Sequence, residues 1–97
     1  MRQVTYCGVP VVTDESFVTI PETAMVVVLD PEEDTTAVQR VQEGFRDFNM
    51  RQGGKPTHIV MTVDDYLTFV DYAFERASVA NIPAFNADGD MEVACLH

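Results

Sequence analysis

The feature that most constrains this chain is an uninterrupted apolar run over residues 24–29 (Ala-Met-Val-Val-Val-Leu). A membrane span takes about 20 apolar residues, so this run is too short to cross a bilayer. Because both faces of the segment are apolar, it is typical of a buried strand that is covered from both sides. We therefore expect an interior β-strand over residues 23–30.

A helix is expected directly after this strand. Asp30 and Pro31 suit the N-cap and the first helical position, and the pair Gly53–Gly54 suits the end of the helix. Between them, apolar residues recur at helical spacing. These residues are Val38, Val41, Phe45 and Phe48.

A second helix is expected after a short buried strand at residues 58–61. Thr62 and Asp65 form a variant of the capping box at its start. Asn81 and Pro83 suit its end, as a left-handed cap and a stop. The face that we expect to point inward consists of Val63, Tyr66, Leu67, Val70, Ala73, Phe74 and Ala77.

The two ends of the chain complete the predicted fold. Residues 1–22 are expected to form an extended arm or edge strands, because Pro10 cannot donate a hydrogen bond in the middle of a sheet. A last strand is expected from Met91 to Cys95, after a turn at Asp88–Gly89.

The order of the elements is thus β-β-α-β-α-β, in a single compact domain over residues 1–97. Residues 1–22 are its arm, and residues 23–97 form a strand-helix-strand-helix-strand core. Two successive strand-helix-strand units predict right-handed crossovers and a mixed, mainly parallel sheet. The predicted class is α/β, with α+β as the alternative.

The net charge of the chain limits the kinds of partner that it is expected to bind. Six Lys and Arg residues stand against sixteen Asp and Glu residues, which gives a net charge of -10. This charge repels phosphate and anionic lipid, so we expect no direct nucleic-acid binding and no membrane binding. The N-terminus shows no cationic and apolar leader. We expect a cytoplasmic or virion protein that is not secreted through a signal peptide.

The sequence shows no pattern that supports catalysis. Gly53–Gly54 precedes Lys55 and not a helix start, so it fits a helix end better than a phosphate-binding loop. Residues 86–90 begin like a calcium loop, but Gly89 stands at the fourth loop position instead of the sixth. We expect a turn there, and no catalytic residue, metal or cofactor.

Two cysteines, Cys7 and Cys95, are too few for a disulfide scaffold. A free cysteine behaves as a small hydrophobic residue. We expect both to be reduced, buried thiols, with a bond between them as the alternative.

The second helix carries the most unusual surface pattern. Asp64, Asp71 and Glu75 form an acidic stripe, and Arg76 is the one basic residue of this helix. The stripe is a solvated face, a docking surface for a basic partner, or a mimic of phosphate spacing.

Two aromatic residues of the second helix, Phe69 and Tyr72, fall outside the expected inner face. They either pack beneath the N-terminal arm or remain exposed as anchors for another chain. Together with the acidic stripe, they predict a protein partner or a homo-oligomer.

Three segments resemble stretches of the major capsid proteins of tailed bacteriophages. They are Gly8–Val12 followed by Asp14, Pro56–Met61 running into Asp65–Leu67, and Met91–Leu96. In that family these pieces belong to a mixed sheet with flanking helices. The resemblance implies a small virion protein or a phage-encoded accessory protein, and it assigns no residue roles.

The favoured hypothesis is a non-enzymatic structural or interaction module that docks on a larger assembly. A second hypothesis is an acidic inhibitor that mimics nucleic acid on a host protein. A third is a small-ligand-binding domain or an enzyme, with a pocket at the carboxyl ends of the core strands near Asp30, Thr62 or Leu96.

Overall fold

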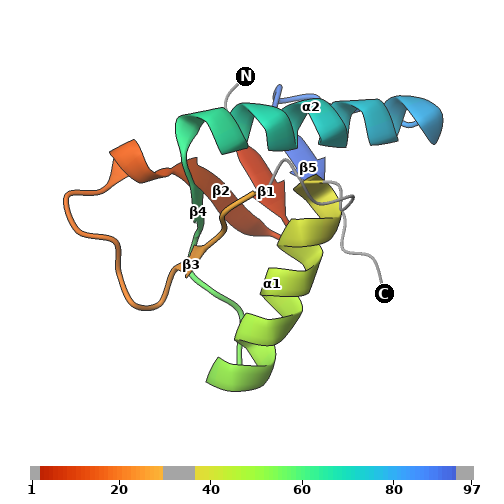
Figure 1. The fold of residues 1–97 in the computed structure, drawn as a ribbon. Helices are drawn as coiled ribbons and strands as arrows, with labels where there is room; N and C mark the ends of the chain where they lie inside the picture. Colours follow the sequence, from red (N-terminus) through yellow and green to blue (C-terminus); the bar gives the residue numbers. More distant parts are fainter. Residues whose placement is uncertain (1–2, 30–36, 94–97) are drawn as a thin grey trace.

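The computed structural model describes residues 3–29 and 37–93. Within these ranges it contains two α-helices and a five-stranded sheet in the order β3-β4-β2-β1-β5 (Figure 1). The α/β class, the single compact domain and the overall order of elements are confirmed. The elements are β1 (Val4–Tyr6), β2 (Val9–Thr13), η1 (Asp14–Ser16), β3 (Met25–Val26), α1 (Ala37–Gln52), β4 (Ile59–Met61), α2 (Val63–Val79) and β5 (Met91–Val93).

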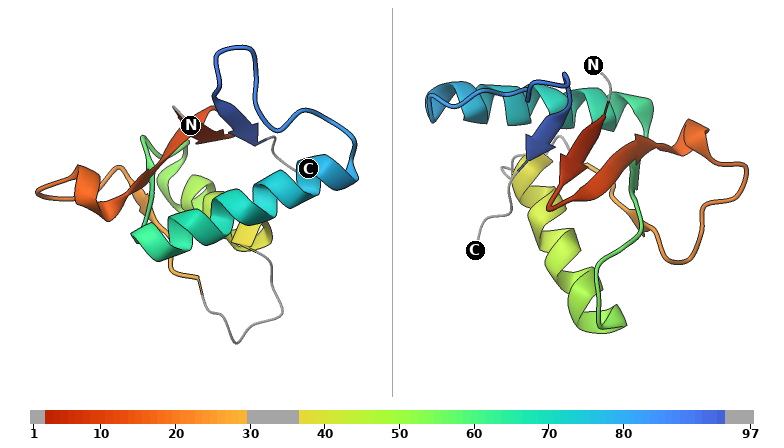
Figure 2. Two further views of the ribbon diagram at one scale, coloured as in Figure 1. Left: turned by 90° about the horizontal axis from the view of Figure 1, so that it is seen from above. Right: turned by 180° about the vertical axis from the view of Figure 1, so that it is seen from behind.

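The sheet is mixed and mainly parallel, as predicted. The pairs β1–β5, β2–β4 and β3–β4 are parallel, and the pair β1–β2 is antiparallel. The antiparallel pair reverses the direction halfway across the sheet, so β5 runs opposite to β4. The segment β4-α2-β5 is therefore not the parallel crossover that we expected. Figure 2 shows both helices on the same side of the sheet.

The predicted arm forms the middle of the sheet, not its edge. β1 and β2 lie between β4 and β5, and a two-residue turn at Cys7 and Gly8 joins them. Both turn residues have positive φ, 52° and 78°, as a type I′ turn requires. Residues 4–13 are therefore a hairpin whose tight turn matches the twist of the sheet.

Pro10 lies within β2, so the expectation that it avoids a central strand is wrong. Tyr6 and Val9 flank the turn, and Thr5 faces Pro10 in the next pair. In a hairpin of this kind the second pair is not hydrogen-bonded, so Pro10 needs no N–H toward β1. On the other side, pairing with β4 begins at Val11. Pro10 thus sits where the ladder needs no donor.

β3 is an edge strand, which corrects the prediction of an interior strand covered on both faces. Met25 and Val27 are buried, but Val26 and Val28 are 57% and 66% exposed. The strand that is buried on both faces is β4, since Ile59, Val60 and Met61 are all buried; it also has a neighbouring strand at each edge, β3 and β2. The apolar run therefore leaves two valines in contact with solvent.

The end of α1 follows the prediction. Gly53 has a φ of 72°, and its N–H donates to the Asn49 carbonyl at 2.9 Å. Glycine adopts this left-handed conformation without the cost of a side chain. The predicted cap at Asp30 and Pro31 lies outside the described residues.

Both ends of α2 are also confirmed. The Thr62 hydroxyl accepts from the Asp65 N–H at 3.2 Å, and this bond satisfies one of the free donors of the first turn. At the other end Asn81 has a φ of 57°, and the Ile82 N–H donates to the Ala77 carbonyl at 3.0 Å. This is the arrangement of a Schellman cap.

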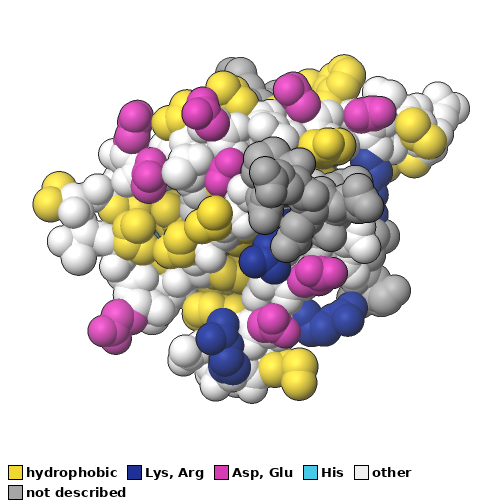
Figure 3. All heavy atoms as spheres, in the orientation of Figure 1, with side chains coloured by type: hydrophobic (Ala, Val, Ile, Leu, Met, Phe, Trp, Pro, Cys, Tyr) yellow, Lys and Arg dark blue, Asp and Glu magenta, His cyan; other side chains and the backbone are white. Residues whose placement is uncertain are grey.

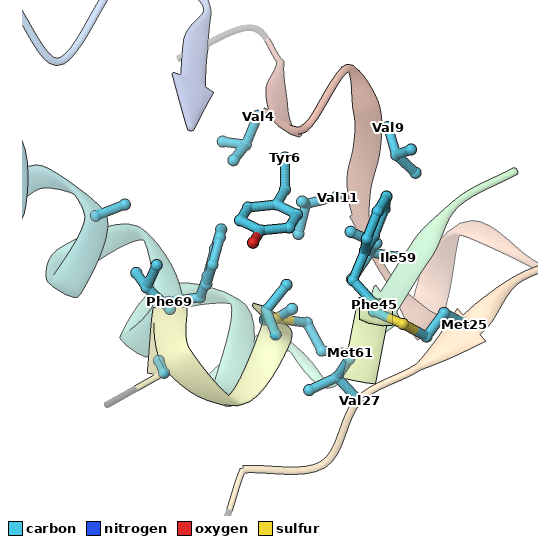
Figure 4. Close-up of a cluster of buried hydrophobic side chains, with 14 of the residues drawn as sticks. Val4, Tyr6, Val9, Val11, Met25, Val27, Phe45, Ile59, Met61 and Phe69 are labelled. Atoms are coloured by element: carbon cyan, nitrogen blue, oxygen red, sulfur yellow. The ribbon is translucent and has the colours of Figure 1, made fainter. Parts of the chain in front are cut away.

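The core lies between the sheet and the two helices (Figure 4). Tyr6 of β1 meets Phe45 of α1 edge to face, with ring centroids 5.5 Å apart. Each large apolar side chain that leaves water stabilises the fold by about 1.5–3 kcal/mol. The predicted inner face of α1 is confirmed, since its buried residues are Ala37, Val38, Val41, Phe45 and Phe48.

Candidate functional site

The orientation of α2 differs from the prediction. Its buried residues are Phe69 and Ala73, and Figure 4 shows Phe69 pointing from the helix into the core toward Tyr6. Phe69 is 0% exposed. Of the two alternatives for this residue, packing against residues 1–22 therefore holds, because Tyr6 belongs to them, and the role of a surface anchor does not. The expectation that Phe69 lies outside the inner face is therefore wrong.

Three residues of the expected inner face lie outward instead. Val63, Leu67 and Phe74 are 37%, 54% and 48% exposed. The physical reason is that α2 carries apolar residues on more than one side, while the sheet and α1 contact it on one side. The core accepts Phe69 with the small Ala73, and the row that contains Leu67 and Phe74 stays in solvent.

These apolar residues adjoin the acidic stripe. Leu67 lies three positions after Asp64 and four before Asp71, and Asp71 lies three before Phe74. Residues at these spacings are neighbours on a helix surface. We call the combined surface the outer face of α2. It consists of Val63, Asp64, Leu67, Asp71, Phe74 and Glu75.

The acidic residues of this face are solvent-exposed and unbalanced. Asp64, Asp71 and Glu75 are all exposed, and Figure 3 shows acidic side chains along the top of the molecule, where α2 lies. Within the described ranges the ion pair found is Arg40 with Glu43, at 4.0 Å on α1. The negative charge of the outer face is therefore directed to solvent.

Asp65, the neighbouring acidic residue, has a different role. One of its carboxylate oxygens accepts from the Leu29 N–H at 3.2 Å, and its own N–H donates to the helix cap. Asp65 is half-buried. It therefore fastens the start of α2 to the chain just after β3 and is not part of the outer face.

Tyr72 lies on α2, on the other side of the acidic stripe from Leu67 and Phe74, and is 42% exposed. It lines an open groove of about 460 Å³ between α2 and the start of α1. Tyr72 is thus accessible, but it is separated from Leu67 and Phe74 by the acidic residues. The full lining is Val38, Tyr72, Glu75, Arg76, Val79 and Ala80.

The far end of the outer face continues onto the segment after α2. The rings of Phe74 and Phe85 are 6.2 Å apart, and Phe85 is 40% exposed. Ile82, between them in sequence, is 59% exposed. The apolar surface is thus larger than the helix alone provides.

The structure gives structural roles to the residues considered for metal or ligand binding. Asn86 Oδ1 accepts from the N–H groups of Asp88 and Asp90, at 3.0 Å each, and Gly89 has a φ of 83°. The predicted turn is therefore confirmed. In the described part of the chain, no group of three or more His, Cys, Asp or Glu side chains is placed to hold a metal ion.

Only part of the predicted pocket at the carboxyl ends of the strands falls within the described residues. Thr62 serves as the cap of α2, whereas Asp30 and Leu96 lie outside the described ranges. Burial raises the pKa of the half-buried Tyr66 phenol above its ordinary value.

Cys7 is disulfide-bonded, so the prediction of a reduced thiol at this position is wrong. Its backbone N–H donates to the Val93 carbonyl at 3.1 Å, which places the hairpin turn beside the end of β5. The chain continues from β5 toward its other cysteine, Cys95, which lies outside the described residues. The hairpin turn therefore brings Cys7 close to the C-terminal strand, and this proximity could not be predicted from the number of cysteines.

No helix in the described ranges is long and apolar enough to span a bilayer. No protein-family model, curated protein or solved structure matches the chain. The resemblance to phage capsid segments therefore stays a prediction, and the outer face of α2 is the observation on which a function is proposed.

Proposed function

We propose that this chain is a non-enzymatic interaction module that docks on a larger assembly through the outer face of α2. The observation that supports this proposal is the exposure of Leu67 and Phe74, at 54% and 48%, next to carboxylates that have no basic neighbour within hydrogen-bonding distance in the described residues. Exposed apolar side chains that adjoin one another mark interaction sites. The partner would offer an apolar ridge flanked by Lys or Arg.

The same surface is a poorer mimic of nucleic acid. With a rise of about 1.5 Å per helical residue, Asp64 and Asp71 are separated along the axis by about twice the distance between Asp71 and Glu75. A phosphate backbone has regularly spaced charges. Leu67 and Phe74, which interrupt the carboxylates, have no counterpart in it. These features favour a protein-docking face over the inhibitor hypothesis.

A phage virion or accessory role is one setting for such a module, and it rests on the resemblance of the three segments alone. Within a virion, the partner would be a structural protein with either an acidic or a basic surface. The outer face of α2 favours the basic one.

Affinity capture from the source organism, followed by mass spectrometry, tests the proposal. The wild-type chain and a Leu67→Ser/Phe74→Ser variant would serve as baits. Met50→Ser is the matched control, because Met50 is 79% exposed and lies on α1. We expect one partner to be retained by the wild type and by Met50→Ser and lost by the double variant. Equal retention by all three baits would contradict the proposal.

A further inference from the structure

The outer side of β3 presents backbone groups that a further strand could bind. The N–H groups of Met25 and Val27 donate to the carbonyls of His58 and Val60, at 2.9 Å each. Successive residues of a strand direct their N–H and C=O groups to opposite edges. Those of Val26 and Val28 therefore point away from β4, and no strand in the described ranges pairs with that side.

The side chains at this edge are also unprotected. Val26 and Val28 are 57% and 66% exposed, and Figure 3 shows an apolar patch on this side of the molecule, below α2. Edge strands in natural proteins usually carry a charge, a proline or a bulge that blocks a further strand. β3 has none of these between Met25 and Leu29.

The opposite edge of the sheet, at β5, is protected in that way. Met91 donates to the Gln3 carbonyl at 2.8 Å, and the Val93 carbonyl accepts from Cys7, so Glu92 is the residue of β5 that faces outward. Glu92 is exposed, and its carboxylate accepts from the Asn86 side chain at 3.2 Å. The outward position of β5 thus carries a charged residue of the kind that disfavours a further strand, and the outward positions of β3 carry none.

The charge around the open edge decides which occupant it fits. Residues 20–29 contain no Lys or Arg. The exposed Glu22 precedes β3. A second copy of the chain carries the same net charge of -10, and repulsion between two such chains disfavours self-pairing. We propose that the β3 edge binds an extended, basic segment of a partner protein as an additional strand.

This binding site is separate from the outer face of α2, so either proposal can fail without the other. A synthetic peptide of alternating valine and lysine serves as the probe. Titration into the isotope-labelled chain, followed by amide NMR signals, shows where it binds. We expect the signals of Val26 and Val28 to shift most and their amide exchange to slow. The same peptide with proline at its central valine keeps the charge and should not bind.

Val26→Pro is the decisive variant. It removes an outward N–H without touching the bonds to β4, and proline is tolerated at an edge facing solvent. We expect it to weaken peptide binding by about tenfold or more. Val26→Thr, which keeps the N–H and the branched side chain, should bind like the wild type. If Val26→Pro fails to fold, Val26→Lys replaces it, and its added charge should weaken binding of the lysine peptide.

Three results would overturn the inference. The first is peptide binding that shifts α2 signals and leaves Val26 and Val28 unchanged. The second is equal binding of the proline-containing peptide, which would show attraction by charge alone. The third is slowed exchange at Val26 and Val28 on concentrating the chain without peptide, which would make a second copy the occupant. A Leu67→Ser chain should bind the peptide normally.

Discussion

The two helices of this molecule are almost equal in length, yet they bury their apolar residues to very different extents. α1 has five buried residues in 16, and α2 has two in 17. α1 carries a single apolar row, and the core takes all of it. α2 carries apolar residues on two sides, and the core takes the side with Phe69. The comparison shows that a surplus apolar row is left in solvent, where we propose that it binds a partner.

The largest expected effect on stability comes from placing an aspartate at a buried position of α1, compared with an exposed position of α2. Val41 is 0% exposed, and Val41→Asp would leave a buried charge unpaired, at a cost of about 3–5 kcal/mol. Leu67→Asp places the same carboxylate in solvent and should cost less than about 1 kcal/mol. Urea denaturation of both variants measures these costs. Similar losses for the two would show that Leu67 belongs to the core.

A second pair of substitutions makes the comparison within α2 itself. Phe69→Ala should destabilise the fold by about 3–5 kcal/mol, because it leaves a cavity in the core. Phe74→Ala removes the same atoms from a half-exposed ring and should cost about 1 kcal/mol or less. Thermal and urea unfolding check both values. The reverse ranking would mean that α2 is turned as its sequence pattern predicted.

Much of the fold could be predicted because its signals are local. Thr62, Gly53 and Asn81 act through hydrogen bonds and φ angles within a few residues, so their positions in the sequence suffice. The positions of β3 and of the hairpin depend on which strands pair, and this is decided by contacts between distant segments. The uninterrupted apolar run predicts a strand at residues 24–29, but it does not encode whether a neighbouring strand pairs with each edge.

The candidate site was predicted in part for the same reason. The acidic row of Asp64, Asp71 and Glu75 is visible as spacing along one helix. The prediction for Phe69 and Phe74 is wrong, because it places Phe74 in the core and Phe69 outside the inner face. The sequence of α2 contains two apolar rows, and only the packing of the helix decides which of them is buried. The signal that was available is the number of apolar rows, since a helix against one side of a sheet buries one of them.

A smaller effect is expected at the cap of α2. Thr62→Ala removes the acceptor for the Asp65 N–H and should cost about 1 kcal/mol. Thr68→Ala is the control, because the exposed Thr68 hydroxyl donates to the Asp64 carbonyl inside the helix and alanine is the better helix former there. Urea midpoints that fall equally for both variants would argue against the cap.

The smallest effect on stability is expected from neutralising the acidic stripe. Replacing Asp64, Asp71 and Glu75 by Asn, Asn and Gln relieves repulsion and should hold or raise the stability by a few tenths of a kcal/mol. Association with the captured partner should become slower and less dependent on salt, because complementary charge acts mainly on the encounter rate. Surface-binding kinetics at low and moderate salt measure this. Unchanged kinetics would leave the row as a solvated face.

Hydroxyl-radical footprinting of the chain, free and bound to its captured partner, tests the role of the outer face of α2 most directly. The side chains of Leu67, Phe74 and Met50 are all exposed in the free chain, so each should be oxidised. In the complex we expect oxidation of Leu67 and Phe74 to fall and that of Met50 on α1 to stay the same. Protection of Met50 with unchanged oxidation of Leu67 and Phe74 would contradict the account.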